Sequence, residues 1–80
     1  MERRLAQAVR NSLNLPRLRV RVRRNPARRS WSFCLEQGRA HSEWMELDAR
    51  SAAVMKKVGL LPPIHLGLFR LAYDALQRKE

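Results

Sequence analysis

The sequence has little of several residue types on which whole classes of protein depend. Its 80 residues include one cysteine, Cys34, two histidines and seven acidic residues. A single cysteine excludes an internal disulfide, and the histidines and cysteine do not have the spacing of a zinc site. We therefore expect no metal, no cofactor and a reducing, cytoplasmic location.

Long apolar stretches are also missing. No run approaches the roughly 20 residues that cross a bilayer, so we expect no membrane span. No apolar segment follows the N-terminal arginines, as it would in a secretory signal. Low-complexity segments and internal repeats are absent as well. Residues 1–80 are thus expected to form a single small basic domain with a modest core.

Positive charge is what the chain has in excess, and it is unevenly placed. The formal net charge is +10, and arginine supplies 14 of the 17 basic residues. Residues 1–30 hold ten arginines and one acid, whereas residues 31–80 hold seven basic and six acidic residues. The two parts therefore carry +9 and +1. A local basic surface of this kind is typical of proteins that bind nucleic acids or other anionic partners.

The segment from Arg17 to Arg24 alternates arginine with apolar residues. Period two is typical of a strand with one buried face, which here would carry Leu18, Val20 and Val22. The outer face would carry Arg17, Arg19, Arg21 and Arg23. Because like charges at this pitch repel one another, the row predicts an anionic partner. A phosphate backbone suits it best, since a guanidinium binds phosphate oxygens bidentately.

Further elements follow from apolar spacing and from turn residues. Helices are predicted over residues 2–13, 49–58 and 63–78, and strands over residues 31–36 and 43–48. Residues 24–30 and 37–42 are expected to be hairpin connections. Asp48 or Ser51 is expected to cap the second helix, and Gly59 to end it. The outer faces of the strands would bring Glu36 or Glu46 near an arginine of the first strand.

These elements predict an α+β fold in the order α-β-β-β-α-α, with helices on one face of a three-stranded antiparallel sheet. The order resembles, in topology alone, the double-stranded-RNA-binding fold and the small ribonuclease toxins that share it. The lysine cluster of that fold is missing from the start of the helix after the sheet, since Lys56 and Lys57 lie at its end. No functional residue is carried over from this resemblance.

The apolar face of the segment 63–78 is unusually wide. It predicts burial on two sides, either between the sheet and the preceding helix or at a homodimer contact. Gly67 within this segment would mark close approach to another backbone.

The leading functional hypothesis is a non-catalytic nucleic-acid-binding protein. The predicted phosphate-binding residues are Arg3, Arg4, Arg10, Arg17, Arg19, Arg21, Arg23, Arg24, Arg28 and Arg29. Trp31 is expected in the core, whereas Trp44 lies on the opposite face from Met45 and Leu47 and is the candidate for stacking on bases.

Two other functions remain open. The first is a small interaction or inhibitor protein, of the phage or mobile-element type, that docks on an acidic protein surface. The second is a toxin-like ribonuclease, for which His41 is the candidate base near phosphate. His65, near a helix N-terminus, is expected to be buried or to make an ordinary structural hydrogen bond. Catalysis is the less favoured hypothesis, because one loop histidine supplies only part of an active site.

Overall fold

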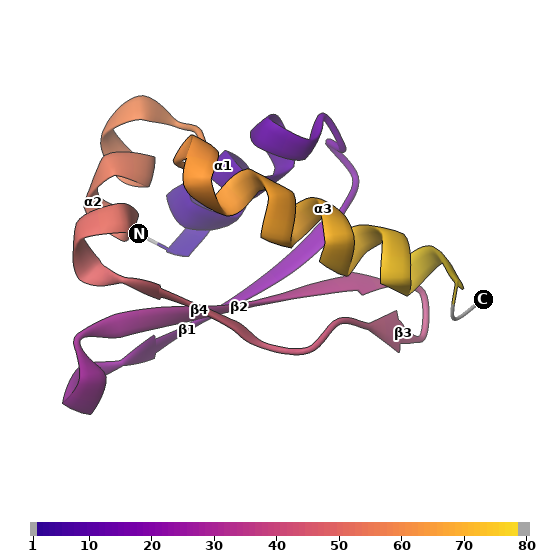
Figure 1. Cartoon of the computed structure of the whole chain (residues 1–80), viewed down its shortest axis with the longest axis horizontal. Coiled ribbons are helices and arrows are strands. Elements are labelled where there is room, and N and C mark those ends of the chain that lie inside the picture. The colour runs from indigo at the N-terminus through magenta and orange to yellow at the C-terminus, as the bar shows by residue number, and fades with distance from the viewer. Residues whose placement is uncertain (1, 79–80) are drawn as a thin grey trace.

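The three α-helices that the structure describes lie on one face of an antiparallel sheet (Figure 1). The structure is a computed structural model, and it describes residues 2–78. Its elements are α1 (Glu2–Leu13), β1 (Arg19–Asn25), η1 (Pro26–Arg28), β2 (Ser30–Gln37), β3 (Ala40–His41), β4 (Met45–Asp48), α2 (Ala49–Val58) and α3 (Pro63–Arg78). The predicted α+β class and element order are confirmed. The third predicted strand, residues 43–48, corresponds to β4, which begins two residues later, while the short strand β3 lies in the segment predicted as a loop.

Strand β2 lies at the centre of the sheet. It pairs with β1 along one edge and with β3 and β4 along the other, always antiparallel. The register sets Val22 opposite Phe33 and Arg23 opposite Ser32. Because side chains alternate between faces, this register places the valines toward the helices and the arginines on the other face.

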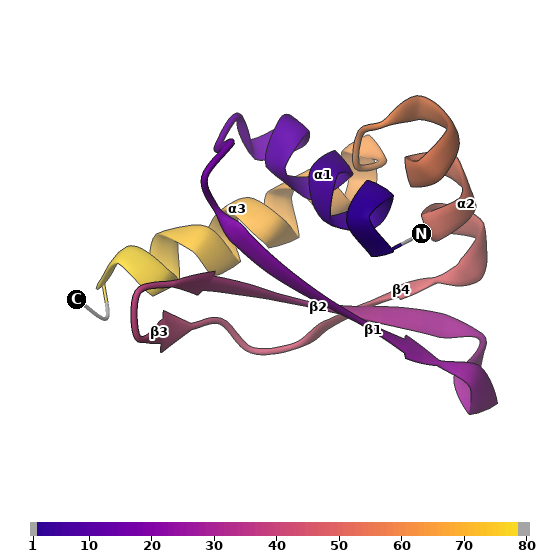
Figure 2. The same ribbon diagram turned by 180° about the vertical axis from the view of Figure 1, so that it is seen from behind.

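The core forms between the sheet and the helices. Phe33 of β2 and Phe69 of α3 are fully buried, with ring centroids 5.8 Å apart and planes inclined at 72°. Leu5 and Val9 of α1 are also fully buried, as their spacing predicts. Figure 2 shows α1 packed on the same side of the sheet as α3. Among the described residues, the opposite face of the sheet therefore has no α-helix covering it (Figures 1 and 2).

The connection between β2 and β4 differs from its prediction. A loop was expected over residues 37–42, but Gln37 and Ala40 pair across a tight turn in which Gly38 has a φ of 60°. The sheet is interrupted instead at residues 42–44. There the hydroxyl of buried Ser42 accepts a hydrogen bond from the Leu35 N–H at 2.9 Å and donates one to the Glu43 carbonyl at 2.9 Å. The Ser42 hydroxyl thus takes the place of a backbone carbonyl as the acceptor for the Leu35 N–H. The alternation of apolar and polar residues does not reveal this contact.

Replacing Ser42 with alanine should lower the free energy of unfolding by about 1–3 kcal/mol, because the buried Leu35 N–H would lose its acceptor. Urea denaturation measures the change. Glu43→Ala, at the exposed neighbouring position, is the control and should shift stability by less than about 0.5 kcal/mol. Equal effects of the two substitutions would contradict the role given to Ser42.

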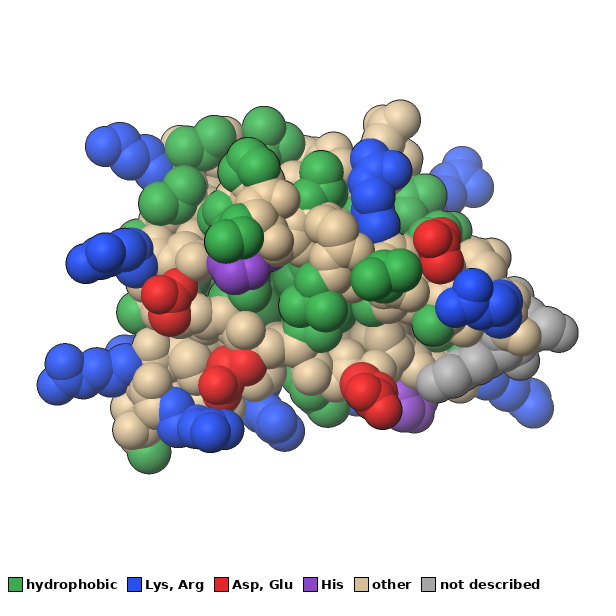
Figure 3. Space-filling model, viewed as in Figure 1, with side chains coloured by type: hydrophobic (Ala, Val, Ile, Leu, Met, Phe, Trp, Pro, Cys, Tyr) green, Lys and Arg blue, Asp and Glu red, His purple; other side chains and the backbone are tan. Residues whose placement is uncertain are grey.

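Helix α3 spans the predicted residues, but only part of its apolar face is buried by this chain. Phe69 and Leu76 enter the core, whereas Ile64 is 84% exposed and Leu71 is 65% exposed. Figure 3 shows apolar side chains gathered on the surface over α2 and α3. A β-carbon added at Gly67 would meet no neighbouring atom within 4 Å, so the close approach expected there does not occur within the chain. The rest of this face is left for a partner or for solvent.

Candidate functional site

Three arginines of β1 lie on the face of the sheet that carries no helix. Arg19, Arg21 and Arg23 are exposed, while the intervening Val20 and Val22 are half-buried and pack against the core. The alternation in the sequence therefore predicts the two faces of this strand correctly. We call Arg19, Arg21, Arg23 and Trp44 the sheet-face cluster.

Small polar residues of β2 form the floor beneath this cluster. Ser32 and Cys34 lie opposite Arg23 and Arg21 in the register, and both are buried although they face away from the helices. The Asn25 amide donates a hydrogen bond to the Ser32 hydroxyl at 2.7 Å, and the Cys34 thiol donates one to the Ser42 carbonyl at 3.2 Å. Because the side chains of Ser32 and Cys34 are short, longer side chains from the neighbouring strands can lie flat across them.

Trp44 is one of those longer neighbours. Its ring centroid lies 4.5 Å from the guanidinium carbon of Arg23 and 5.8 Å from that of Arg21. The residue is 39% exposed and belongs to the sheet interruption that Ser42 supports. An aromatic ring flanked by guanidinium groups offers both a stacking surface and positive charge.

Two acids reduce the charge of this surface in part. Glu36 lies 3.4 Å from Arg21, which fulfils the expectation that a strand acid would pair with the row. Glu46 lies 3.4 Å from Arg28, at the hairpin tip rather than on the strand. The side chains of both ion pairs are partly exposed to solvent. Ion pairs of this kind stabilise the fold by at most about 1 kcal/mol. An anionic partner can therefore compete for these arginines.

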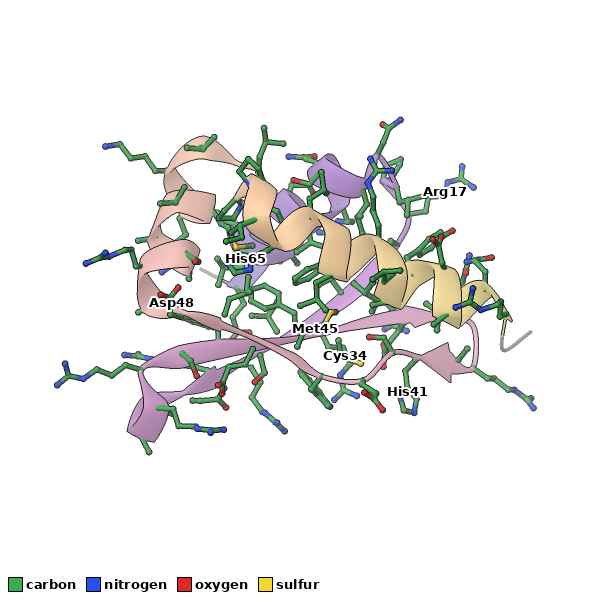
Figure 4. All side chains as sticks on the ribbon, in the orientation of Figure 1. Arg17, Cys34, His41, Met45, Asp48 and His65 are labelled. Atoms are coloured by element: carbon green, nitrogen blue, oxygen red, sulfur yellow. The ribbon has the colours of Figure 1, made fainter. Side chains whose placement is uncertain are left out.

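Arg17 does not lie in the row to which the sequence assigned it. The Leu18 N–H donates a hydrogen bond to the Leu15 carbonyl at 3.1 Å, so the chain makes a turn through Pro16 and Arg17 before β1 begins. Figure 4 shows Arg17 beside the turn between α1 and β1, on the side of the sheet that carries the helices. The expected row of four arginines on the strand is thus a row of three.

The arginines of α1 also lie on the helix side. Arg3 and Arg10 line a groove along the edge of β1 together with Arg21, whereas Arg4 is exposed elsewhere on the helix. The Arg10 guanidinium donates hydrogen bonds to the Leu18 carbonyl at 3.4 Å and to the Gln7 side chain at 3.3 Å. Arg3 and Arg10 can extend a binding surface around the strand edge, but they do not share the sheet face.

The arginines of the hairpin tip divide between the two faces. Arg28 reaches Glu46, whereas Arg24 and Arg29 line a cavity on the helix side together with Lys56. Sequence reasoning placed Lys56 at a helix end and gave it no role. The alternation that continues through Arg23 and Arg24 could have indicated that these two neighbours point to opposite faces.

The two histidines have different surroundings. His65 is half-buried, and its Nε2 lies 3.1 Å from the Ser51 hydroxyl, the structural hydrogen bond that the sequence predicts. His41 is exposed and points away from the helices (Figure 4). It pairs in register with Glu36, which in turn pairs with Arg19, so one row across the open face holds an arginine, a carboxylate and an imidazole.

Asp48 is the N-terminal cap of α2. The sequence had offered either Asp48 or Ser51 for this role. Hydrogen bonds from the Ser51 side chain and from its backbone N–H lower the pKa of the Asp48 carboxyl below its ordinary value. A carboxyl with a lowered folded-state pKa stabilises the fold above its unfolded pKa, near 4, and this contribution is lost as the pH falls through the folded value. Gly59, with a φ of 82°, ends the helix as expected.

Replacing Asp48 with asparagine should therefore make stability less dependent on pH below about 4, because asparagine also caps helices but does not titrate. Thermal unfolding between neutral and acidic pH measures this. The two proteins should differ in the acidic range more than between pH 6 and 7. Parallel curves over the whole range would contradict the assignment.

Comparison with known proteins does not assign a family. No family model matches the chain, and no match is found among curated proteins or solved structures. Within the described residues, no helix is long and apolar enough to span a membrane, and no group of three or more acidic, histidine or cysteine residues is placed to hold a metal.

Proposed function

We propose that the chain binds nucleic acid through the open face of its sheet, mainly by contacts to the phosphate backbone and without strong preference for sequence. The observation that carries the proposal is the sheet-face cluster, in which Arg21 and Arg23 lie against the exposed Trp44 and Arg19 continues the row, on a face that no described α-helix covers. Guanidinium groups bind phosphates, and an exposed indole stacks on bases.

An unpaired strand fits this surface better than a duplex. Stacking on Trp44 requires a base whose face is accessible, which a single strand provides without the cost of unpairing. The short side chains of Ser32 and Cys34 form the floor of this face, so an extended single strand has a shallow surface to lie on. We therefore expect single strands to bind more tightly than duplexes of the same length.

A salt titration tests the proposal, with labelled single-stranded and duplex oligonucleotides of RNA and DNA. If six to eight phosphates are neutralised, log K should fall with log salt at a slope between about −4 and −7. No binding at about 50 mM salt, or a slope near zero, would contradict it. That result would favour the acidic protein surface as the partner.

A second candidate function is cleavage of RNA, and the row of Arg19, Glu36 and His41 favours it. Cross-strand neighbours on one face have β-carbons about 5 Å apart, so the row brings a carboxylate, an imidazole and a guanidinium to one region. The His41 Nδ1 lies 3.2 Å from the Ser42 carbonyl oxygen. A carbonyl can only accept a hydrogen bond, so Nδ1 carries the proton and Nε2 is the nitrogen that exchanges one.

In this candidate reaction the base is Glu36 and not His41, to which the sequence assigned that role: Glu36 takes the proton of a ribose 2′-hydroxyl as that oxygen attacks the adjacent phosphorus. The bond from phosphorus to the 5′ oxygen breaks, and protonated His41 gives its proton to the leaving oxygen. Arg19 stabilises the charge that develops on the phosphoryl oxygens. The products are a 2′,3′-cyclic phosphate and a 5′-hydroxyl.

Incubation of purified protein with labelled RNA and with DNA of the same sequence tests this candidate. RNA alone should be cleaved, and Glu36→Gln or His41→Gln should reduce the rate by a factor of about 100 or more. Glu43→Gln is the control and should cleave as the parent does. Absence of cleavage removes the candidate and leaves the binding proposal intact.

We propose in addition that the exposed face of α3 pairs with a second copy of the chain. The exposed apolar stripe on α3 consists of Ile64, Leu68 and Leu71. Residues 31–80 carry only +1 of the net charge, so charge repulsion between two copies of this part of the chain is small. Leu71→Glu should then abolish a dimer seen by sedimentation, while Gln7→Glu on α1 should not. A parent chain that is monomeric at high concentration would contradict this.

A further inference from the structure

A cavity with three basic side chains lies where the β1–β2 hairpin meets α2. Its volume is about 530 Å³, and its walls include Arg24, Arg29, Trp31 and Lys56. Ala49 and Lys56 of α2 line it, so it lies on the helix side of the sheet, whereas the sheet-face cluster lies on the other side. The two sites are therefore separated by strand β1 and the hairpin.

Register, packing and turn geometry bring these cations together. Arg24 lies opposite Trp31 in the register, and its guanidinium carbon is 6.0 Å from the centroid of the indole ring. The Lys56 ammonium approaches the same ring from α2, at 5.3 Å. Arg29 enters the wall because it closes the hairpin in a left-handed conformation, with a φ of 49°. That conformation is strained for a residue other than glycine.

The cavity wall contains no acidic side chain among the described residues. Arg28 and Glu46 form their ion pair at the hairpin tip and do not line it. Basic side chains that gather at one cavity make it attractive to an anion, because a bound anion lowers the repulsion among them. Two guanidinium groups and an ammonium provide donors for several oxygens of a single tetrahedral anion. Trp31 is only 8% exposed, so it forms a wall and is not available for stacking on a base.

We propose that this cavity binds a phosphate group. The group can come from a nucleic-acid backbone that passes around the edge strand β1, because Arg23 and Arg24 are adjacent and project to opposite faces. In that case the site rests on the proposed nucleic-acid binding and adds a phosphate contact beyond the sheet face. The group can also belong to a free phosphate compound, and then the site is independent of nucleic-acid binding.

Trp31 reports occupancy, because two of the cations that would hold the phosphate lie against its ring. In a Trp44→Phe chain, Trp31 is the one tryptophan left of the two in the sequence. We would titrate this chain with inorganic phosphate, with pyrophosphate and with a single-stranded oligonucleotide at constant ionic strength. Circular dichroism confirms that each variant is folded. The expected result is a saturable change in Trp31 emission.

The test variant is Arg24→Gln/Lys56→Gln, made in the Trp44→Phe chain. The matched control is Arg50→Gln/Lys57→Gln, which removes the same charge from exposed positions of α2 outside the cavity. The emission change should disappear in the test variant and persist in the control. If the phosphate belongs to a nucleic-acid backbone, oligonucleotide affinity should also fall about tenfold more in the test variant, with a salt slope smaller by about 1–2.

A response to phosphate or pyrophosphate with unchanged oligonucleotide affinity supports the site and assigns it to free phosphate compounds. That outcome is independent of whether the sheet face binds nucleic acid, which variants of Arg19 and Arg23 address separately. If no probe changes the emission of Trp31, or if test and control variants respond alike, the proposal is overturned.

Discussion

Replacement of Arg19, Arg21 and Arg23 by glutamine is expected to weaken binding of a single-stranded oligonucleotide by roughly 100-fold to 1,000-fold at low salt. Each arginine that contacts a phosphate contributes through the release of counterions, so the slope of log K against log salt should also become shallower by about 2–3. The fold should be retained, because all three side chains are exposed and the valines between them remain. Fluorescence anisotropy at several salt concentrations measures both quantities.

The matched control removes three positive charges from the helix side of the sheet. Arg50, Lys57 and Arg70 are exposed on α2 and α3, so their replacement by glutamine changes net charge by the same amount. We expect less than a tenfold loss of affinity in this control. Equal losses in the two triple variants would show that binding depends on net charge alone and not on the sheet face.

The second large effect is expected in the core. Phe69→Ala should reduce the free energy of unfolding by about 3–5 kcal/mol, because it removes a fully buried ring that packs edge-on against Phe33. A domain of this size has a total stability of roughly 4–12 kcal/mol. Much of the population should therefore be unfolded under mild conditions, and the nucleic-acid affinity should fall with it. Urea denaturation followed by circular dichroism measures the loss.

Leu71→Ala is the control for this substitution, since Leu71 lies on the same helix but is 65% exposed. It should change the stability of the monomer by no more than about 0.5 kcal/mol. A large loss for Leu71→Ala, with a small one for Phe69→Ala, would mean that α3 packs on the sheet through a different face.

The sequence predicted the element order because each element carries its own local signal. Alternating residues identify β1, and capping residues define both ends of α2. The inward face of α3 was less predictable, since Phe69, Leu71 and Leu76 are equally apolar and only packing decides that Leu71 remains exposed. The position of Arg17 likewise depends on a turn whose hydrogen bond involves backbone atoms.

The candidate site was predictable where it follows a single strand and unpredictable where it combines distant elements. Arg19, Arg21 and Arg23 share a face by periodicity alone. The approach of Trp44 to two of them depends on the sheet interruption at Ser42, and the approach of Lys56 to Arg24 depends on how α2 packs beside Trp31. Alternation with Met45 and Leu47 does place Trp44 on the open face, but its contact with the arginines and the contact of Lys56 with Trp31 depend on packing.

The most direct test of the binding face is a nuclear magnetic resonance titration of labelled protein with a single-stranded oligonucleotide. We expect the Trp44 indole N–H and the amides of β1 to show large shifts, while the methyl groups of Ile64 and Leu71 on the far side remain unchanged. Shifts confined to α2 and α3, with Trp44 and β1 unaffected, would contradict the assignment of the open sheet face as the nucleic-acid interface.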